Sequence, residues 1–373
     1  MGLSQLQGLL TYMDYNMTLM PIPTPIAIVG AGNRVNRFYT EIIKEFSKQG
    51  LVRIVGIYNR SLEKARKIAK YLNCPVYFSL EELIKKGIPS AIILAISPEA
   101  KDEFAEQILK RGIHLFLETP ASFSSSKVWQ LADIARQKNV IVEVAEDEAF
   151  SPEAQLHRKI IESNILGRVI AVFNDDLEYY YHACARLHIL VGSLPPIASC
   201  ISRNIRLRDG ARVEYREILF DSGLCYFHRY VSPKRHLIRA SPDWRVICEH
   251  GVMSNHGIVI RQPDGTNQHC RFLVDGKNLF PMPEGQINRI SVTLEDREFS
   301  WSTLYDLPHW TRQHWGVSHL LRGFLGCLQG QNQLFYGIQR AARDIEIFQQ
   351  MESPSWAVKF WRKIKSFRKL RYE

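Results

Sequence analysis

The sequence predicts an α/β domain with a parallel sheet, followed by a second half built mainly from an antiparallel sheet. From residue 25 to about 145, fully apolar runs alternate with amphipathic helices. This pattern is typical of parallel strands covered by helices on both faces. After Glu148 short strands follow one another, some separated by turn signals such as Pro263-Asp264-Gly265. The length of 373 residues is enough for two domains and a large core.

The first two predicted strands, 25–29 and 52–58, enclose a Gly-x-Gly turn. Gly30 and Gly32 stand at the end of the first apolar run, and a helix is expected over 35–46. Glycine lets the backbone approach a pyrophosphate, and the following helix N-terminus attracts an anion. The order strand, turn, helix, strand therefore predicts a dinucleotide site. The alternative is an ordinary strand-to-helix turn in a domain that binds no ligand.

Three further residues qualify this prediction. Asn33 and Arg34 follow the glycines and are expected to lie beside the bound phosphates. Val35 occupies the position of the third glycine in the G-x-G-x-x-G fingerprint. That glycine normally allows close packing of helix and strand, so Val35 implies a slightly displaced helix or a looser coenzyme fit.

The end of the second strand favours NADP over NAD. An NAD site places a carboxylate there for the ribose hydroxyls, whereas this chain has Asn59, Arg60 and Ser61. An arginine with neighbouring amide and hydroxyl groups suits a 2′-phosphate. The alternative is that Arg60 is a solvated helix residue and Ser61 only an N-cap.

The remaining elements follow in order along the chain. In the first half, helices are expected over 62–71, 80–86, 99–111 and 126–138, and strands over 76–78, 91–96, 114–117 and 140–144. In the second half, helices are expected over 153–163, 314–328 and 337–351, and strands over 169–173, 212–220, 224–230, 245–249, 257–261, 271–274 and 298–301.

Composition narrows the class of protein. The seven cysteines include no Cys-x-x-Cys pair, which favours a reducing cytoplasm and argues against a disulfide framework or a zinc site. No metal-ligand spacing of histidines occurs, and no apolar run is long enough to cross a membrane. The net charge of +10 suits an anionic small ligand, while no nucleic-acid motif is present.

Four motifs together resemble a known enzyme family in their order and spacing. They are Gly30-Ala31-Gly32, Ala95-Ile96-Ser97-Pro98, Glu118-Thr119-Pro120 and Ile165-Leu166-Gly167-Arg168-Val169. With the helix over 337–351, they make residues 24–353 resemble the Gfo/Idh/MocA family of NAD(P)-dependent oxidoreductases. The resemblance implies a Rossmann domain and a C-terminal α+β domain with a large, mostly antiparallel open sheet. It also implies that Ser97, Glu118 and Pro120 line the coenzyme.

The same resemblance implies the partners. Typical substrates of the family are small molecules such as sugars, inositols and nucleotide-sugars, and the open sheet usually contributes to a homo-oligomer. The expected boundaries are an N-terminal extension over 1–24, disordered by expectation, the dinucleotide-binding domain over 25–147, the substrate and oligomerisation domain over 148–353, and a basic amphipathic helix over 354–373.

The resemblance assigns the catalytic residues, with one departure. Thr119 stands where the family usually has a lysine that assists proton transfer, and its hydroxyl does not titrate near pH 7. Glu178 and His182 have the family's acid–histidine spacing, which places both on one helix face. His182 would be the proton donor and Glu178 would orient it, while Arg186, one turn further, would bind a substrate anion. The alternative is that His182 is a hydrogen-bonded histidine at a sheet–helix junction.

Two functions therefore remain open at this point. The first is an NADP-preferring oxidoreductase acting on a sugar-like or other cyclic carbonyl or alcohol. The second, suggested by Thr119 and Val35, is a catalytically impaired sensor or scaffold that binds a dinucleotide or a sugar. Basic and aromatic residues over 356–372 fit the surface of an anionic membrane, so the tail would place a cytoplasmic protein at its inner face. Docking of the tail on its own domain or on a partner subunit is the alternative.

Overall fold

The computed structural model describes residues 22–175, 180–206, 212–232, 243–276, 287–303, 307, 310–331 and 333–351. The N-terminal extension, Glu178 and the basic tail lie outside the described residues, so what was predicted for them stays a prediction. Among the described helices, none has the length and apolar character that crossing a membrane requires.

The first domain is built on a six-stranded parallel sheet with the order β3-β2-β1-β4-β5-β6. This is the strand order of a doubly wound dinucleotide-binding fold, with the reversal of winding between β1 and β4. The strands are β1 Thr24–Val29, β2 Val52–Tyr58, β3 Val76–Tyr77, β4 Ala91–Leu94, β5 His114–Glu118 and β6 Val142–Ala145. Their side chains are mostly buried on both faces, as the apolar runs predicted.

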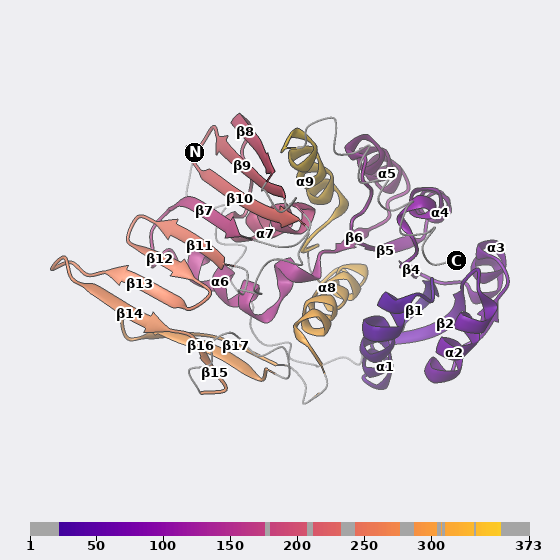
Figure 1. Cartoon of the computed structure of the whole chain (residues 1–373). Coiled ribbons are helices and arrows are strands. Elements are labelled where there is room, and N and C mark those ends of the chain that lie inside the picture. Colours follow the sequence, from indigo (N-terminus) through magenta and orange to yellow (C-terminus); the bar gives the residue numbers. More distant parts are fainter. Residues whose placement is uncertain are drawn as a thin grey trace.

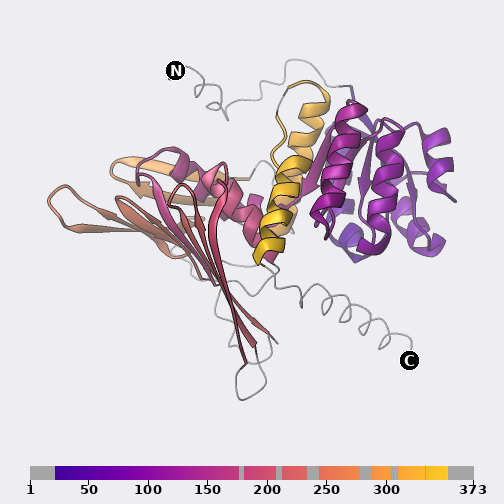
Figure 2. The same cartoon turned by 90° about the horizontal axis from the view of Figure 1, so that it is seen from above.

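Helices cover both faces of this sheet (Figures 1 and 2). They are α1 Thr40–Lys48, α2 Leu62–Leu72, α3 Leu80–Glu82, α4 Pro98–Lys110 and α5 Ser125–Gln137. The segment before α1 differs from the regular helix predicted over 35–46, because Val35–Tyr39 form a π-helical turn, η3. A second π-helical turn, η4 Leu83–Gly87, extends α3. Val35 is fully buried in η3, so the valine in place of glycine is accommodated by a widened helical turn.

The second half contains an eight-stranded sheet with the order β14-β13-β12-β11-β7-β10-β9-β8. Of its described pairs, only that of β7 with β10 is parallel. The large, mostly antiparallel sheet that was predicted is thus confirmed. Its strands are β7 Val169–Asp175, β8 Ile197–Arg206, β9 Arg212–Phe220, β10 Cys225–Ser232, β11 Asp243–Cys248, β12 Gly251–Ser254, β13 Gly257–Arg261 and β14 Asn267–Arg271.

A small antiparallel sheet and several helices complete this half. The sheet comprises β15 Leu273–Val274, β16 Arg289–Leu294 and β17 Arg297–Ser302. The helices are η5 Asp147–Phe150, which is a 3-10 turn, α6 Pro152–Glu162, α7 Tyr180–Val191, α8 Arg312–Leu328 and α9 Ile338–Met351. Figure 2 shows the described helices on one face of the large sheet, between that sheet and the first domain.

The last two helices tie the halves of the chain together. Trp129 Nε1 on α5 donates to Glu346 on α9 at 2.6 Å, and His314 Nε2 on α8 lies 3.0 Å from the carbonyl oxygen of Arg37. A Cβ on Gly316 of α8 would lie 2.2 Å from the carbonyl oxygen of Asp147. Glycine at that position therefore lets α8 press directly on η5, which follows β6 and carries part of the site described below.

Candidate active site

The candidate site lies at the carboxyl ends of the parallel strands, where open α/β sheets bind their ligands. The turn after β1 approaches this edge closely. Gly30 has a φ of +121°, and a Cβ on it would lie 2.1 Å from the carbonyl oxygen of Ala95. Gly32 is exposed, and a Cβ there would meet nothing within 4 Å. An open glycine immediately before a helix is the arrangement that a pyrophosphate requires, so the residues present fit a dinucleotide.

The end of β2 is fastened to this turn by one side chain. Asn59 Oδ1 accepts a hydrogen bond from the backbone N–H of Ala31 at 3.0 Å, and its Nδ2 donates to the carbonyl of Ser61 at 2.9 Å. Asn59 therefore shapes the turn. Ser61 occupies the N-cap position of α2, although its side chain makes no capping hydrogen bond. Arg60, between them, is exposed.

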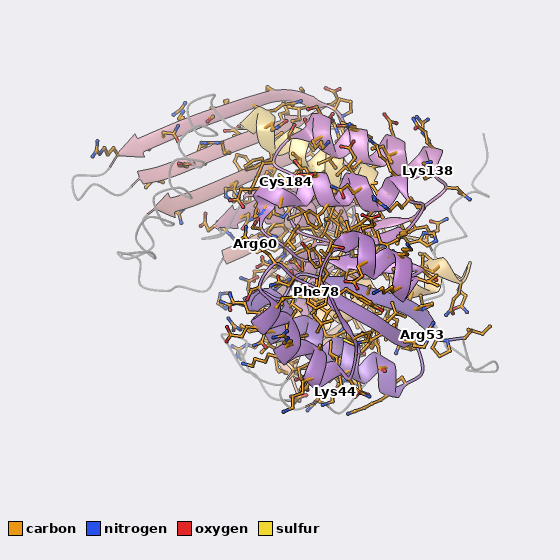
Figure 3. All side chains as sticks on the ribbon, turned by 90° about the vertical axis from the view of Figure 1, so that its right-hand side faces the viewer. Lys44, Arg53, Arg60, Phe78, Lys138 and Cys184 are labelled. Carbon is orange, nitrogen blue, oxygen red and sulfur yellow. The ribbon has the colours of Figure 1, made fainter. Side chains whose placement is uncertain are left out.

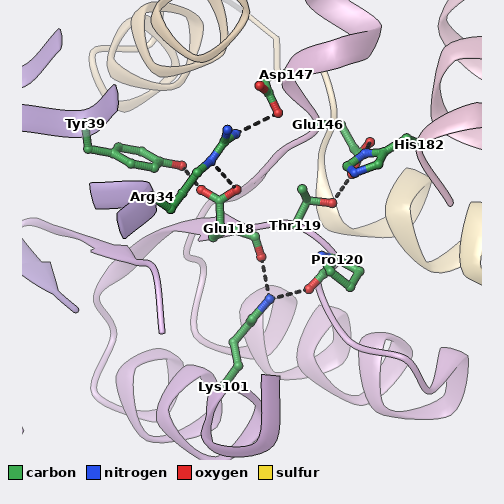
Figure 4. Close-up of polar contacts among 9 residues, drawn as sticks. All are labelled: Arg34, Tyr39, Lys101, Glu118, Thr119, Pro120, Glu146, Asp147 and His182. Carbon is green, nitrogen blue, oxygen red and sulfur yellow. Dashed lines mark hydrogen bonds and ion pairs between the residues drawn. The ribbon is translucent and has the colours of Figure 1, made fainter. Parts of the chain in front are cut away.

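Arg34 reaches across the sheet edge from the turn to two carboxylates (Figure 4). Its Nε lies 3.0 Å from Glu118 Oε1 at the end of β5, and its Nη2 lies 2.7 Å from Asp147 Oδ1 on η5. Glu118 also accepts a hydrogen bond from the hydroxyl of Tyr39. Burial raises the pKa of Asp147 to about 6, although the positive charge of Arg34 pulls it down. Arg34 thus joins the glycine turn to β5 and η5, and Asn33 and Gly32 precede it at the surface.

A buried lysine fixes the tripeptide that follows β5. Lys101 on α4 is 2% exposed, and its Nζ donates to the carbonyl oxygens of Glu118 at 2.9 Å and of Pro120 at 2.6 Å. Burial lowers the pKa of Lys101 to about 8, although Glu118 and other acids oppose this effect. The backbone on both sides of Thr119 is therefore held by one ammonium group. Ser97, the residue before α4, is exposed at the neighbouring strand end.

Thr119 and His182 meet on a third residue, Glu146. The Thr119 hydroxyl donates to Glu146 Oε1, and His182 Nδ1 lies 2.9 Å from Glu146 Oε2. Burial alone would lower the pKa of His182, but Glu146 and the neighbouring acids outweigh it and raise this pKa to about 10. The acidic surroundings therefore favour the charged form of the imidazole. In Figure 4 this group lies beside Glu118 and Pro120.

The other residues predicted for the site have different surroundings. Arg186 lies one turn after His182 on α7, and its guanidinium stacks on the ring of Trp244 at 4.3 Å. The described part of α7 begins at Tyr180, and Glu178, which was predicted to pair with His182, lies outside the described residues. Among the described residues, no group of three or more His, Cys, Asp or Glu side chains could hold a metal ion.

Four of the residues at this edge were not predicted from the sequence. They are Tyr39, Lys101, Glu146 and Asp147. One signal was available for two of them, because Glu146 and Asp147 come directly after β6, and the carboxyl ends of parallel strands meet at one edge. Tyr39 and Lys101 lie inside helical segments, where their spacing shows nothing beyond an ordinary helix.

The glycine turn, the parallel sheet and the polar cluster at its carboxyl edge define a dinucleotide-binding α/β domain joined to an α+β domain. Residues 24–146 match the family model for the oxidoreductase family with an NAD-binding Rossmann fold, GFO_IDH_MocA. The first domain thus matches the Gfo/Idh/MocA oxidoreductase family that the motifs resemble.

Curated relatives resemble only part of the chain. An uncharacterized oxidoreductase of Synechocystis sp. is 31% identical over 116 residues, which cover 31% of this chain and 31% of that protein. The curated relatives that were compared match over 40% or less of their own length.

Solved structures resemble nearly the whole chain. The UDP-N-acetylglucosamine 3-dehydrogenase of Acidithiobacillus ferrooxidans has a TM-score of 0.63 at 12% identity, over 89% of this chain and 97% of that one. An oxidoreductase of Agrobacterium radiobacter, solved in complex with NAD+, L-tartaric acid and magnesium, has a TM-score of 0.64 at 12% identity, over 86% and 92%. At this level of identity, the likeness establishes the fold alone.

Proposed function

We propose that this protein is an NADP-preferring oxidoreductase that transfers a hydride to or from a sugar-like or other cyclic carbonyl or alcohol. The observation that carries the proposal is the contact of Thr119 and His182 with Glu146, at the sheet edge that also carries the glycine turn. A half-buried histidine whose charged form is favoured by Glu146 suits proton transfer that accompanies hydride transfer. The name of the Acidithiobacillus structure, a nucleotide-sugar dehydrogenase, supports a sugar-like substrate.

The proposal assigns each predicted coenzyme residue a place along a dinucleotide. Gly30, Gly32 and Asn33 would cradle the pyrophosphate, and Arg34, Glu118, Pro120 and Ser97 would line the nicotinamide half. Asn59, Arg60 and Ser61 would surround the adenosine ribose, with Arg60 available for a 2′-phosphate. Bound NADPH would supply the hydride for a carbonyl carbon, and NADP+ would accept it from the carbon of an alcohol.

The chain's own residues would manage the proton. In carbonyl reduction, a C–H bond forms from the hydride, and the carbonyl oxygen takes one proton to become a hydroxyl. The protonated His182 would give up that proton and become neutral, and in alcohol oxidation it would take the proton back. Thr119 would donate a hydrogen bond near the reacting oxygen. Glu178 would assist His182, and Arg186 would bind an anionic part of the substrate.

The coenzyme preference is testable with a matched pair of arginines, one near each end of β2. Arg60 follows the carboxyl end of β2, whereas Arg53 is exposed near its start. Figure 3 places the two on opposite sides of the domain. A charge-assisted hydrogen bond contributes about 1.5–3 kcal/mol. We therefore expect Arg60→Ala to weaken NADPH binding by about 10- to 100-fold and to leave NADH binding unchanged.

Nicotinamide fluorescence during titration of the purified protein measures both affinities. Arg53→Ala should leave both affinities at the value of the unaltered protein. Equal loss of NADPH affinity in both variants would contradict the assignment of Arg60. Failure of the unaltered protein to bind either coenzyme would contradict the proposed function as a whole.

The alternative function is a sensor or scaffold that binds a dinucleotide or a sugar without turnover. The observation that favours it is Thr119, whose hydroxyl does not titrate near neutral pH and is engaged by Glu146. Coenzyme binding without NADPH consumption, across a panel of keto-sugars and cyclic ketones, would favour the sensor. NADPH consumption with any of these substrates would exclude it.

A further inference from the structure

Glu146 lies at the centre of the polar contacts beside the cradle, although no motif marks it. It directly follows β6 and is 2% exposed. Its two oxygens contact different elements: Oε1 accepts from Thr119 after β5, and Oε2 lies 2.9 Å from His182 Nδ1 on α7. A buried carboxylate is costly unless it is paired and hydrogen-bonded. Glu146 meets this requirement, because one of its oxygens accepts from a hydroxyl and the other contacts an imidazole.

The surroundings of His182 are mainly acidic. Besides Glu146, the acids Asp147 and Glu148 face it from η5, and both favour its charged form. On α9, Asp344 lines the same small space as Glu146 and Thr119, and it binds His188 at 2.6 Å. Arg34 pairs with Asp147 at 2.7 Å and so partly neutralises that acid. Glu146 Oε2 lies 2.9 Å from Nδ1 of the His182 ring, which is within hydrogen-bond distance.

We propose that Glu146 is a positioning residue, which holds His182 as a charged proton donor and couples it to the Thr119 hydroxyl. The inference rests on the proposed function for its catalytic meaning. The carboxylate fixes the ring by binding Nδ1–H, and the same carboxylate orients the hydroxyl through its other oxygen. Thr119 and His182 thus act as one unit on the substrate oxygen, although they come from different domains of the chain.

The proton balance follows from this arrangement. On carbonyl reduction, one N–H bond of the His182 ring breaks and one O–H bond of the product forms, while the hydride from the coenzyme makes the new C–H bond. The neutral ring keeps its Nδ1–H on Glu146, so the ring stays in place for the return of a proton. Loss of the carboxylate would leave the imidazole without its anchor and would weaken the preference for its charged form.

The test measures the titration of His182 directly, without coenzyme or substrate. The full chain is labelled with 13C and 15N in histidine, and the His182 signals are assigned by comparison with His182→Gln. NMR titration then compares the unaltered protein with Glu146→Gln. Glu143→Gln is the matched control, because Glu143 is also a buried carboxyl on β6, and its Oε1 accepts from the backbone N–H of Tyr336.

We expect His182 to stay charged through neutral pH in the unaltered protein. In Glu146→Gln the titration midpoint should fall by about 1–3 pH units, the effect of removing a close opposite charge. The control should leave the midpoint unchanged. A midpoint in Glu146→Gln equal to that of the unaltered protein would overturn the proposal. If this variant does not fold, Glu146→Asp replaces it, since its shorter side chain cannot reach both partners; an unchanged midpoint there would also overturn it.

Two readouts separate this inference from the proposed function. NADPH affinity should be the same in Glu146→Gln and the unaltered protein, because the carboxylate holds the proton donor and not the coenzyme. With a substrate in hand, kcat should fall by about 10²- to 10⁴-fold with little change in KM. If the unaltered protein binds no coenzyme, the proposed function fails while the histidine titration still decides what Glu146 does.

Discussion

Gly30 and Gly32 lie two residues apart in one turn, yet a side chain would meet different surroundings at each. At Gly30 a Cβ would clash with the carbonyl oxygen of Ala95 at 2.1 Å, and the φ of +121° is strained for other residues. At Gly32 a Cβ would meet no protein atom within 4 Å. The turn therefore needs glycine at position 30 for its backbone conformation and its packing against Ala95. At position 32, glycine keeps open the space that a pyrophosphate would take.

This difference predicts opposite outcomes for two alanine substitutions. Gly32→Ala should leave the melting temperature unchanged and weaken coenzyme binding by about tenfold or more, equivalent to at least ~1.4 kcal/mol. Gly30→Ala should lower the free energy of unfolding by about 1–3 kcal/mol through backbone strain alone. Thermal unfolding and NADPH titration measure the two effects. Unchanged coenzyme affinity in a folded Gly32→Ala protein would argue against a phosphate cradle at this turn.

Part of the candidate site could be predicted at the scale of single residues, and part could not. The glycines, Asn59 and Arg60 follow strand ends, and a local pattern marks such positions. Arg34 and Glu118 were also named, but as coenzyme residues, and the structure joins them in an ion pair across 84 positions of the chain. Local patterns contain no information on such pairs, because only the packing of the sheet brings the two strand ends together.

At the scale of elements, β6 and the segment before α9 are joined by a buried carboxyl. Glu143 is fully buried, its Oε1 accepts from the backbone N–H of Tyr336 at 2.5 Å, and its backbone forms a bridge with Gly337. Its Oε2 has no hydrogen-bond partner among the described residues. Burial raises the pKa of Glu143 to about 8, although the hydrogen bond from Tyr336 opposes this effect. The side chain is therefore largely protonated at neutral pH.

A carboxyl of this kind makes stability depend on pH with a defined sign. Its pKa is higher in the folded than in the unfolded protein, so its contribution to stability is fully present below about 4.5 and is lost as pH rises through about 8. Glutamine stays neutral throughout. Glu143→Gln should therefore gain stability relative to the unaltered protein between pH 5 and pH 9, by about 1.4 kcal/mol for each unit of upward pKa shift.

Urea unfolding at pH 5, 7 and 9 measures this difference. Glu103→Gln, which changes an exposed carboxylate on α4, is the control and should show no such trend. A difference between Glu143→Gln and the unaltered protein that is flat or falls with pH would show that Glu143 is ionised in its buried position.

Elements were easier to predict than contacts, for a physical reason. Strands of the parallel sheet are buried on both faces and read as continuous apolar runs, so all six were expected. In the large sheet, β8, β12 and nearly all of β14 were missed. Most residues of β8 are exposed, so its sequence lacks the apolar alternation that marks a half-buried strand. The π-helical turn η3 was also missed, because its residues have the apolar spacing of an ordinary helix.

At the scale of the whole molecule, the outer face of the large sheet is without a covering layer in the described structure. Figure 2 shows the described helices on the opposite face. Ile201, Leu219 and Phe227 share the outer face by their register with Glu217 and Cys225. Ile201 and Leu219 are 43% and 38% exposed, and Phe227 stacks on Phe173 with ring centroids 4.5 Å apart. Glu217 lies between Ile201 and Phe227 on this face. An exposed face that carries several large apolar side chains among polar ones typically marks a protein interface.

We therefore predict a homo-oligomer whose subunits join through this face. An aspartate at Leu219 would bury a charge in the interface, which costs several kcal/mol when the charge is unpaired. Leu219→Asp should shift the mass in solution to that of the monomer at concentrations where the unaltered protein is oligomeric. Size-exclusion chromatography with light scattering measures this mass.

Ile88→Asp provides the matched control, because Ile88 is an apolar residue of the first domain and is 74% exposed. It should leave the mass of the oligomer unchanged, since the same charge enters a surface that the proposed interface does not use. An unaltered protein of monomeric mass, or an oligomer that Leu219→Asp leaves intact, would contradict this use of the sheet. If Leu219→Asp and Ile88→Asp both reduced the mass to that of the monomer, the effect would not be specific to the sheet face. That result would also contradict an interface at this face.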